Sequence, residues 1–358
     1  KNFRVFSSII STTINTYHNQ IFFHGIICGL CSPTIMSNRF YKSRYKILIM
    51  EILEKTISDS DMCWDNTLEN SPEKFSVVLN SKSLDELLIN RGKISNEDPN
   101  DFKFLKEYVE NLKNKILING CGFFVINGHE LSNLSLDEKR SIYTIISKII
   151  GELLEQNKDH EKVVVIKDLG KTMKTGGRYH QTKEGGSYHT DGSHIFKNPP
   201  DYVGLLCINP AKSGGVSKFM SAYTIHNKLL KKQKLQKILY EKFHHDKKNE
   251  NMGEENATRF EPIFQFVNNE LKFKYQRELI FTGHEKAKQP LTQIQIQAIK
   301  FLEEILSNSD QVTAYALKSG DMMFSNNRWL IHDRTLFEDF EDEKLKRLLL
   351  RTWIREHN

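Results

Sequence analysis

The sequence predicts an α+β protein whose core is a double-stranded β-helix, or jelly roll, with flanking helices. Many short β-branched and aromatic runs, punctuated by Gly, Asn and Asp, fill the second half, and long excursions separate them. The 358 residues are 39% hydrophobic and 27% charged, which suits a full hydrophobic core. Collagen-like and wholly disordered classes are excluded, and five cysteines are too few for a disulfide scaffold.

Two helices and two strands are expected in the first part of the folded region. Residues 101–116 carry apolar side chains at helical spacing, and residues 136–156 are predicted as a second helix. Residues 120–126 form an apolar run that an Asn-Gly pair ends, and residues 163–166 are all β-branched. The chain order therefore predicts helix, strand, helix, strand.

The second part is predicted to be rich in strands, with helical stretches at residues 222–243 and 292–306. The lysine-rich stretch 228–255 also holds several acids, so we expect a solvated insertion there rather than a binding patch. We expect one domain over residues 51–358, with a helical insertion around residues 222–260. The expected strands cover residues 202–208, 218–221, 263–267, 271–275, 312–317, 322–325, 329–332 and 347–354.

The net charge of +6 is concentrated at the start of the chain. Residues 1–50 hold six basic groups and no acid, so residues 51–358 hold 45 basic and 45 acidic groups and are neutral. A neutral body has no net field to attract phosphates, so we expect no nucleic-acid partner. Cys63, Cys121 and Cys207 are isolated in apolar contexts, which favours a reducing, cytoplasmic location.

Residues 1–50 are expected to form a basic N-terminal extension. The absence of acids and the several Ser and Thr residues suit a targeting segment, while Met36 and Met50 as possible starts suit a dispensable or non-native leader. These two interpretations stay open. His24 and a Ser-Pro-Thr cluster cut short the apolar run in this segment, so we expect no membrane span.

Three residues are candidate metal ligands. His189 and Asp191 lie two apart, and on a strand residues i and i+2 project from the same face. Two ligands cannot close a site, and His332, in a strand–turn–strand pattern, is the best third candidate. Two histidines and one carboxylate form the facial triad that binds Fe(II) and leaves three positions open for a bidentate cosubstrate and O₂.

The run from residue 347 to residue 354 is strongly apolar yet contains Arg347 and Arg351. Strand alternation places both arginines on one face, together with Leu349 and Trp353. A buried arginine needs an anionic partner, because an unpaired buried charge is very costly. Two interpretations stay open here: a structural pair with an acid, or bidentate capture of a ligand carboxylate.

These motifs, taken in order, resemble the TauD/TfdA-like Fe(II)/2-oxoglutarate dioxygenases, which include the clavaminate synthase-like amino-acid hydroxylases. The resemblance extends over about residues 100–358. It rests on H-T-D at 189–191, G-G-V-S at 214–217, G-D-x-x-x-x-N-N-R-x-x-x-H-D-R at 320–334 and R-x-x-x-R at 347–351. It implies a jelly-roll fold, Fe(II), 2-oxoglutarate as cosubstrate and O₂.

The resemblance also implies roles for single residues. His189, Asp191 and His332 match the iron ligands. Arg347 corresponds to the arginine that binds the distal carboxylate of 2-oxoglutarate, and Ser217 corresponds to a hydroxyl that also hydrogen-bonds 2-oxoglutarate. Arg351 corresponds to a substrate-binding arginine, and Tyr188 to a position at the mouth of the pocket.

Two positions depart from the family pattern. Asp333 stands where relatives often have Gly, and Val216 stands where an acid is common. Neither change removes a ligand, and Asp333 is expected to alter the surroundings of the metal. Asp191 argues for oxygenation, since related halogenases replace this carboxylate with Gly or Ala.

We therefore predict a 2-oxoglutarate-dependent hydroxylase of a small carboxylate or amino-acid-like substrate, which releases succinate and CO₂. One alternative is the same chemistry on a macromolecule, such as an N-methyl group of nucleic acid or protein. Another is a non-catalytic jelly roll that binds a metal. The sequence gives neither the substrate nor the oligomeric state, and it does not separate hydroxylation from desaturation or cyclisation.

Overall fold

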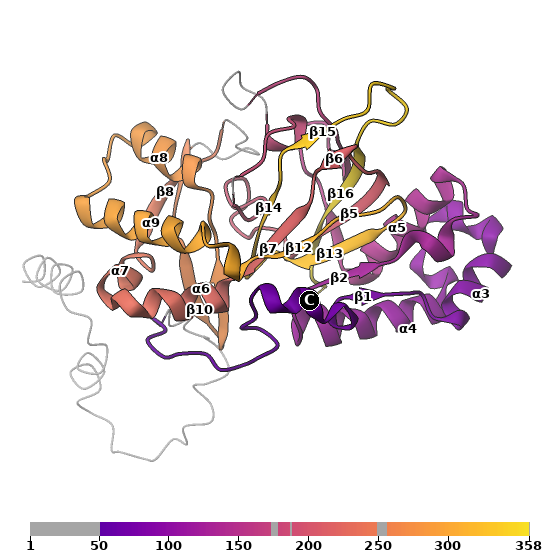
Figure 1. The fold of residues 1–358 in the computed structure, drawn as a ribbon, viewed down its shortest axis with the longest axis horizontal. Helices are drawn as coiled ribbons and strands as arrows, with labels where there is room; N and C mark the ends of the chain where they lie inside the picture. Colours follow the sequence, from indigo (N-terminus) through magenta and orange to yellow (C-terminus); the bar gives the residue numbers. More distant parts are fainter. Residues whose placement is uncertain (1–50, 173–177, 187, 249–255, 358) are drawn as a thin grey trace, which may run out of the picture. The chain divides into compact units, whose positions relative to one another are not determined.

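Two β-sheets form the centre of the protein (Figure 1). The computed structural model describes residues 51–172, 178–186, 188–248 and 256–357. The larger sheet has seven strands in the order β1-β2-β13-β5-β16-β3, with β4 also paired to β16, and the smaller has the order β12-β7-β14. Their bounds are β1 Ser76–Val77, β2 Phe123–Ile126, β3 Glu152–Leu154, β4 Val163–Ile166, β5 Tyr202–Asn209, β7 Ser217–Ser221, β12 Thr313–Tyr315, β13 Met322–Asn326, β14 Leu330–Arg334 and β16 Leu348–Arg355.

Apolar side chains of the two sheets pack against one another. The rings of Phe123 on β2 and Phe219 on β7 stack with their centroids 4.7 Å apart, and both residues are buried. Next to this contact, residues of β5, β13 and β16 from the larger sheet and of β7 and β14 from the smaller one line a shared cavity. The functional side chains of the strands therefore point into the space between the sheets.

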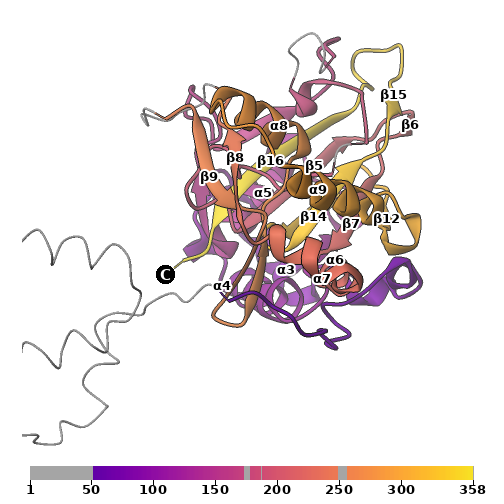
Figure 2. The same ribbon diagram turned by 90° about the vertical axis from the view of Figure 1, so that its left-hand side faces the viewer.

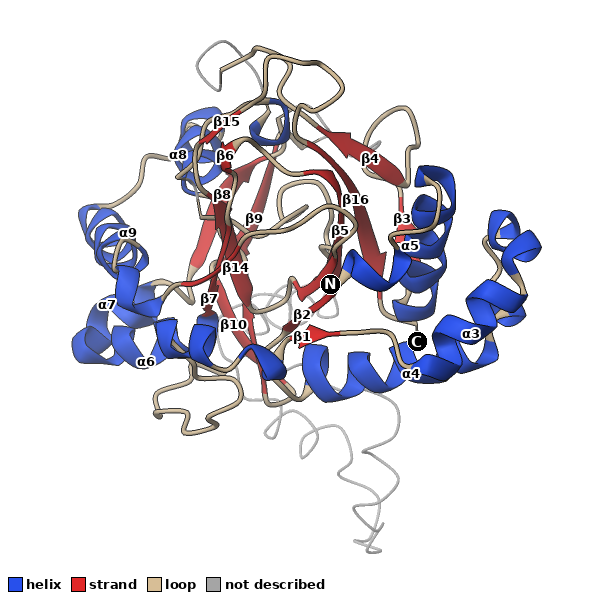
Figure 3. Cartoon of the chain, turned by 45° about the vertical axis from the view of Figure 1, so that its right-hand side comes forward, coloured by secondary structure: helices blue, strands red, loops and turns tan. Residues whose placement is uncertain are grey.

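Helices cover the sheets on two sides (Figure 3). The helix α5 packs on β3, β5 and β16 of the larger sheet, and α4 packs on α5. The helix α6 contacts β7 of the smaller sheet and packs on α9. The turned view in Figure 2 shows α8 next to β8 and β9. The bounds are α3 Ser81–Ile89, α4 Lys103–Leu112, α5 Leu136–Ile150, α6 Ala222–Leu229, α7 Gln233–Ile238, α8 Arg277–Lys286, α9 Gln293–Leu306, β8 Lys242–Asp246 and β9 Thr258–Pro262.

Two predicted helices are shorter in the structure. The helix expected over residues 136–156 starts at a capping box made by Ser135 and Glu138 but ends at Ile150, and the next residues form β3 because they pair with β16. The helix expected over residues 222–243 is divided into α6 and α7, and Phe243 lies on strand β8. Tertiary pairing overrides helical spacing at both ends.

The stretch 228–255 is only partly the solvated insertion that was predicted. Its described part includes β8, where Phe243, His245 and Asp246 are buried and β9 pairs antiparallel alongside. The remaining short strands are β6 Ser213–Gly214, β10 Phe264–Val267, β11 Glu270–Phe273 and β15 Phe337–Glu338. The basic segment 1–50 lies outside the described residues, and within the described ranges no helix is both long and apolar enough to cross a membrane.

Candidate metal centre

Backbone pairing brings His189 and His332 together. The two residues form an isolated antiparallel bridge, in which each amide N–H donates to the carbonyl of the other at 3.0 Å. Their ring centroids lie 4.5 Å apart. His332 belongs to β14, whereas His189 lies in a segment that has only bridge pairing, so this bridge aligns two ligands that are 143 positions apart in the sequence.

The backbone of Asp191 is held by the turn that connects β13 and β14. Asn327, in the turn between β13 and β14, accepts a hydrogen bond from the Asp191 amide at 2.8 Å. The Asn327 side-chain amide donates to the carbonyls of Asp191 and Pro200, both at 2.9 Å. Asn327 is buried and its side chain makes these three hydrogen bonds, so it holds the backbone from which the Asp191 carboxylate projects.

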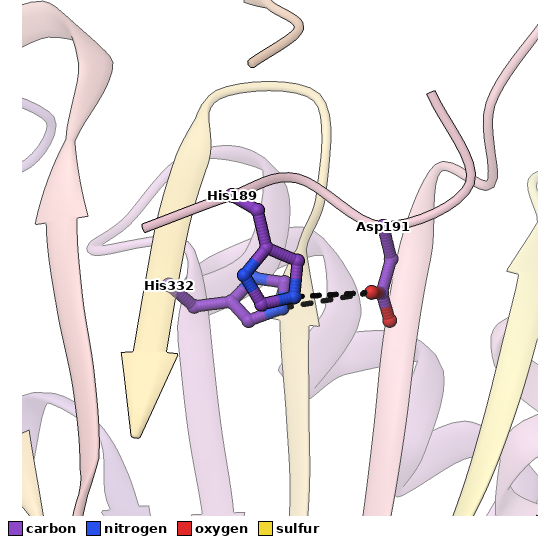
Figure 4. A group of neighbouring side chains, drawn as sticks. All are labelled: His189, Asp191 and His332. Atoms are coloured by element: carbon purple, nitrogen blue, oxygen red, sulfur yellow. Dashed lines mark ion pairs between the residues drawn. The ribbon is translucent and has the colours of Figure 1, made fainter. Parts of the chain in front are cut away.

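The three side chains converge on one point (Figure 4). Asp191 Oδ1 lies 3.6 Å from His189 Nε2 and 3.8 Å from His332 Nε2. One candidate ligand atom from each residue lies within 4.8 Å of the others, and among the described residues no other group of three His, Cys, Asp or Glu side chains does this. Two imidazole nitrogens and one carboxylate oxygen are a donor set that suits Fe(II). The predicted triad is therefore assembled in the structure.

The second oxygen of Asp191 is held on the opposite side. Trp353 Nε1–H donates to Asp191 Oδ2 at 2.8 Å, and Arg351 donates to the same oxygen at 3.3 Å. Arg351 is itself oriented by Gln156, whose Oε1 accepts from its Nε at 2.9 Å. With Oδ2 occupied, Oδ1 is the oxygen that faces the histidines, so the carboxylate is arranged to bind through one atom.

Charge and burial set the protonation of these ligands. Burial alone would raise the pKa of Asp191, but the Arg351 guanidinium and the two imidazoles hold that pKa well below its usual range. Burial lowers the pKa of His332 to about 4, and the neighbouring His189 adds to this shift. An ionised carboxylate and a neutral imidazole are the forms that bind a metal, so the site is prepared to accept one at neutral pH.

An inner cavity extends from the triad toward Arg347. Its lining includes Ser217 on β7 and the predicted face of β16, with Arg347, Leu349 and Arg351. Arg347 is 6% exposed, its Nη1 has no hydrogen-bond partner among the described residues, and burial with nearby Arg334 lowers its pKa to about 10. An unpaired buried guanidinium at the end of a cavity is a binding position for an anion.

An outer cavity opens on the other side of the triad and has a volume of about 610 Å³. His189 and Asp191 line it together with Arg351 and Trp353. Most of its remaining lining is polar. The charged residues in that lining are Lys158, Lys171, Arg178, Lys248, Arg351, Asp159 and Asp191.

Two predicted substrate contacts lie differently from expectation. Tyr188 lines neither cavity, because it precedes His189 in an extended segment and lies under Lys218, whose Nζ is 4.8 Å from the ring centroid. Arg351 lines both cavities, but its guanidinium already contacts Asp191 and Gln156. Its role toward a substrate stays a prediction.

The structure also reveals contacts that the sequence analysis did not assign. Tyr179 lines both cavities, and its ring meets the His189 ring edge-on at 5.1 Å. Tyr179 begins a 3-10 helix of three residues, Tyr179–Gln181, which is too short to show a hydrophobic period in the sequence. Trp353 lies on the predicted face of β16, and Asn327 belongs to the N-N-R run of the motif at 320–334, but the sequence pattern assigns neither residue a role.

Comparisons with known proteins agree with this geometry. The profile of the family described as "Taurine catabolism dioxygenase TauD, TfdA family" matches residues 93–353. The chain is 28% identical over 262 residues to FR-33289 synthase of Streptomyces rubellomurinus (strain ATCC 31215), covering 72% of this chain and 74% of that protein.

Solved structures show the same fold. Asparagine oxygenase in complex with Fe(II), 2S,3S-3-hydroxyasparagine and succinate superposes with a TM-score of 0.59 at 12% identity, over 78% of this chain and 93% of that one. The non-heme iron oxygenase OrfP with Fe and alpha-ketoglutaric acid gives a TM-score of 0.57 at 13% identity, over 79% and 94%.

We expect Trp353→Phe to weaken metal binding about tenfold, because Phe keeps the aromatic packing but removes the N–H that holds Asp191 Oδ2. Titration with Mn(II), followed by the EPR signal of the free ion, measures this. Trp64→Phe is the matched control, since Trp64 Nε1 donates to the Cys121 carbonyl at 3.0 Å, outside both cavities. Equal affinity in Trp353→Phe and wild type would contradict the role given to Trp353.

Proposed function

Because the chain belongs to the TauD/TfdA dioxygenase family, we propose that it hydroxylates an unactivated C–H of a small anionic or amino-acid-like substrate, with Fe(II), 2-oxoglutarate and O₂. The convergence of His189, Asp191 and His332 on one point is the observation that carries this proposal. We assign the two facing sheets to the double-stranded β-helix predicted from the sequence, which is supported by the fold of the oxygenases that superpose on it.

The residues present fit both groups that the reaction requires. His189 Nε2, His332 Nε2 and Asp191 Oδ1 would hold the iron from one side and leave the opposite side to other ligands. Arg347, with an unpartnered buried Nη1, would bind the distal carboxylate of 2-oxoglutarate, and Ser217 on the same cavity wall would donate its hydroxyl. When bound, iron and 2-oxoglutarate together supply the oxidising chemistry, with succinate and CO₂ as by-products.

The protein's own residues position the reactants and limit access of water. Leu205, Leu349 and Met323 give the inner cavity apolar walls, so a cosubstrate there is shielded and its charged end is directed to Arg347. Trp353 and Arg351 fix the orientation of Asp191 before any ligand arrives. Preorganisation of this kind removes the reorientation that a mobile carboxylate would need at each turnover.

The charge of the outer cavity indicates the class of substrate. Asp191 pairs with Arg351. The other charged residues of the described lining are four basic ones, Lys158, Lys171, Arg178 and Lys248, and one acid, Asp159. Since residues 51–358 are neutral overall, this excess of positive charge is local. A small substrate with a carboxylate or another anionic group would be attracted to it.

We expect Fe(II)-dependent formation of succinate from 2-oxoglutarate, and loss of that activity in His189→Ala and Asp191→Ala, because each change removes a metal ligand. His129→Ala is the matched control, since His129 is exposed and lines neither cavity. Succinate is measured by NMR or chromatography. An unchanged rate in either ligand variant would disprove the assignment of that ligand.

We expect Arg347→Gln to weaken 2-oxoglutarate binding by about tenfold to a hundredfold, since hydrogen bonds to a charged group contribute about 1.5–3 kcal/mol. Calorimetric titration of the Mn(II)-loaded protein with 2-oxoglutarate measures the change. Arg355→Gln, a neighbouring arginine on β16 that lines neither cavity, should bind as wild type does. Normal binding by Arg347→Gln would contradict the position given to the cosubstrate.

A substrate screen tests the anionic preference. In pairs of small compounds that differ only as carboxylate and amide, the carboxylate should stimulate 2-oxoglutarate turnover more. Lys171→Gln and Arg178→Gln should raise the KM of an active compound about threefold or more at low salt, while Lys115→Gln, outside the cavities, should not. Salt-sensitive affinity for single-stranded nucleic acid, with no stimulation by small anions, would favour the macromolecular alternative.

A further inference from the structure

A buried carboxylate borders the inner cavity beside the candidate metal centre, on the residue that follows His332. The Asp333 side chain is 0% exposed, and its Oδ2 pairs with Lys218 Nζ at 2.7 Å. The pair forms because Asp333 on β14 and Lys218 on β7 are direct cross-strand neighbours. Tyr188 covers Lys218 on the outer side. The ion pair is therefore shielded by the residue that had been predicted to contact the substrate.

The other oxygen of Asp333 holds two points of one chain segment. Asp333 Oδ1 accepts from the Tyr179 hydroxyl at 2.7 Å and from the Gly186 amide at 3.1 Å. The Tyr179 oxygen in turn accepts from the amide of Arg334 at 3.0 Å. These bonds attach both ends of the segment 179–186, Tyr179 and Gly186, to strand β14.

The adjoining residues strengthen the same attachment. The Arg334 guanidinium donates to the carbonyls of Thr182 and Glu184. Gly185 approaches the backbone so closely that a Cβ would lie 2.5 Å from the Arg334 carbonyl oxygen, and Gly186 has φ of +88°. No strand of its own covers this segment. Besides these side chains, two single backbone hydrogen bonds hold it, from the Gly186 amide to the Arg334 carbonyl and from the Phe337 amide to the Lys183 carbonyl, both at 3.3 Å.

We propose that Asp333 is a positioning residue for the metal centre. By holding Tyr179 and Gly186 on β14, it keeps the His189 side chain close enough to Asp191 and His332 for all three to bind one metal ion. The inference rests on the proposed function, because it takes the triad to bind a metal. Gly186 lies three residues before His189, and the Tyr179 ring abuts the His189 imidazole. The two contacts of Asp333 therefore reach His189 indirectly, through the chain that precedes it and through the Tyr179 ring.

The test compares two substitutions that both remove the charge of Asp333. In Asp333→Asn the remaining Oδ1 still accepts from Tyr179 and Gly186, whereas Asp333→Ala loses both acceptors. We expect Asp333→Ala to weaken Mn(II) binding about tenfold, and Asp333→Asn to stay within about threefold of wild type. Both variants leave Lys218 without its partner, so thermal unfolding should shift downward in both.

Tyr179→Phe provides a milder change that keeps the ring and the bond to Gly186. We expect it to weaken Mn(II) binding about threefold. The double variant Asp333→Ala/Tyr179→Phe should lose less affinity than the two single losses combined, because both changes remove the bond between Tyr179 and Asp333. Tyr108→Phe is the matched control, since the Tyr108 hydroxyl donates to the Val78 carbonyl at 2.5 Å, outside both cavities.

Equal Mn(II) affinities for Asp333→Ala, Asp333→Asn and wild type, with only the unfolding temperature changed, would show that Asp333 is merely structural. Additive losses in the double variant would also overturn the proposal. If Asp333→Ala does not fold, wild-type affinity in Tyr179→Phe overturns it. A failure of the proposed function is recognised separately, because the wild-type protein would then bind Mn(II) no better than His189→Ala does.

Discussion

The carboxylate of Asp191 is the group on which the rest of the site depends, because its two oxygens meet different requirements. Oδ1 faces two imidazoles at 3.6 and 3.8 Å, and Oδ2 accepts from Trp353 and Arg351. A buried carboxylate without these donors would favour its protonated form and would be a poorer ligand. The donors therefore keep it ionised and also leave one defined oxygen for the metal.

Strand β16 relates this carboxylate to the anion position at the far end of the inner cavity. Arg347 directly precedes β16 and Arg351 lies on it, and both line the inner cavity. Four residues of extended chain correspond to about 13 Å. One arginine is thus available to an external anion while the other is engaged with Asp191. The two arginines therefore serve different partners. The Arg351 guanidinium contacts Gln156 and Asp191, whereas the Arg347 guanidinium lies over the Phe337 ring and its Nη1 has no hydrogen-bond partner among the described residues.

The sequence predicted the parts of the site that follow from regular geometry. His189 and Asp191 do converge with His332, although Asp191 begins a turn and does not continue a strand. Arg347, Leu349 and Arg351 line one cavity, as alternation along an extended chain predicts. Tyr179 was missed because the position of the segment 179–186 depends on contacts with Asp333 and Arg334 from a distant strand. The place given to Tyr188 at the mouth of the pocket stays a prediction. The same limit explains the helix boundaries: residues 152–154 become a strand because β16 pairs with them.

Asp333 departs from the family pattern, and the surrounding strands supply partners for its buried carboxylate. A carboxylate in this buried position requires a cation, and the antiparallel register of β7 and β14 places Lys218 directly opposite. Once that pair exists, the second oxygen is available for donors of the segment that carries His189. The candidate metal site and the strand pairing are then coupled. Asp333 forms the cross-strand ion pair and also accepts hydrogen bonds from the segment before His189, a residue whose own strand pairing consists of isolated bridges to Gln276 and His332.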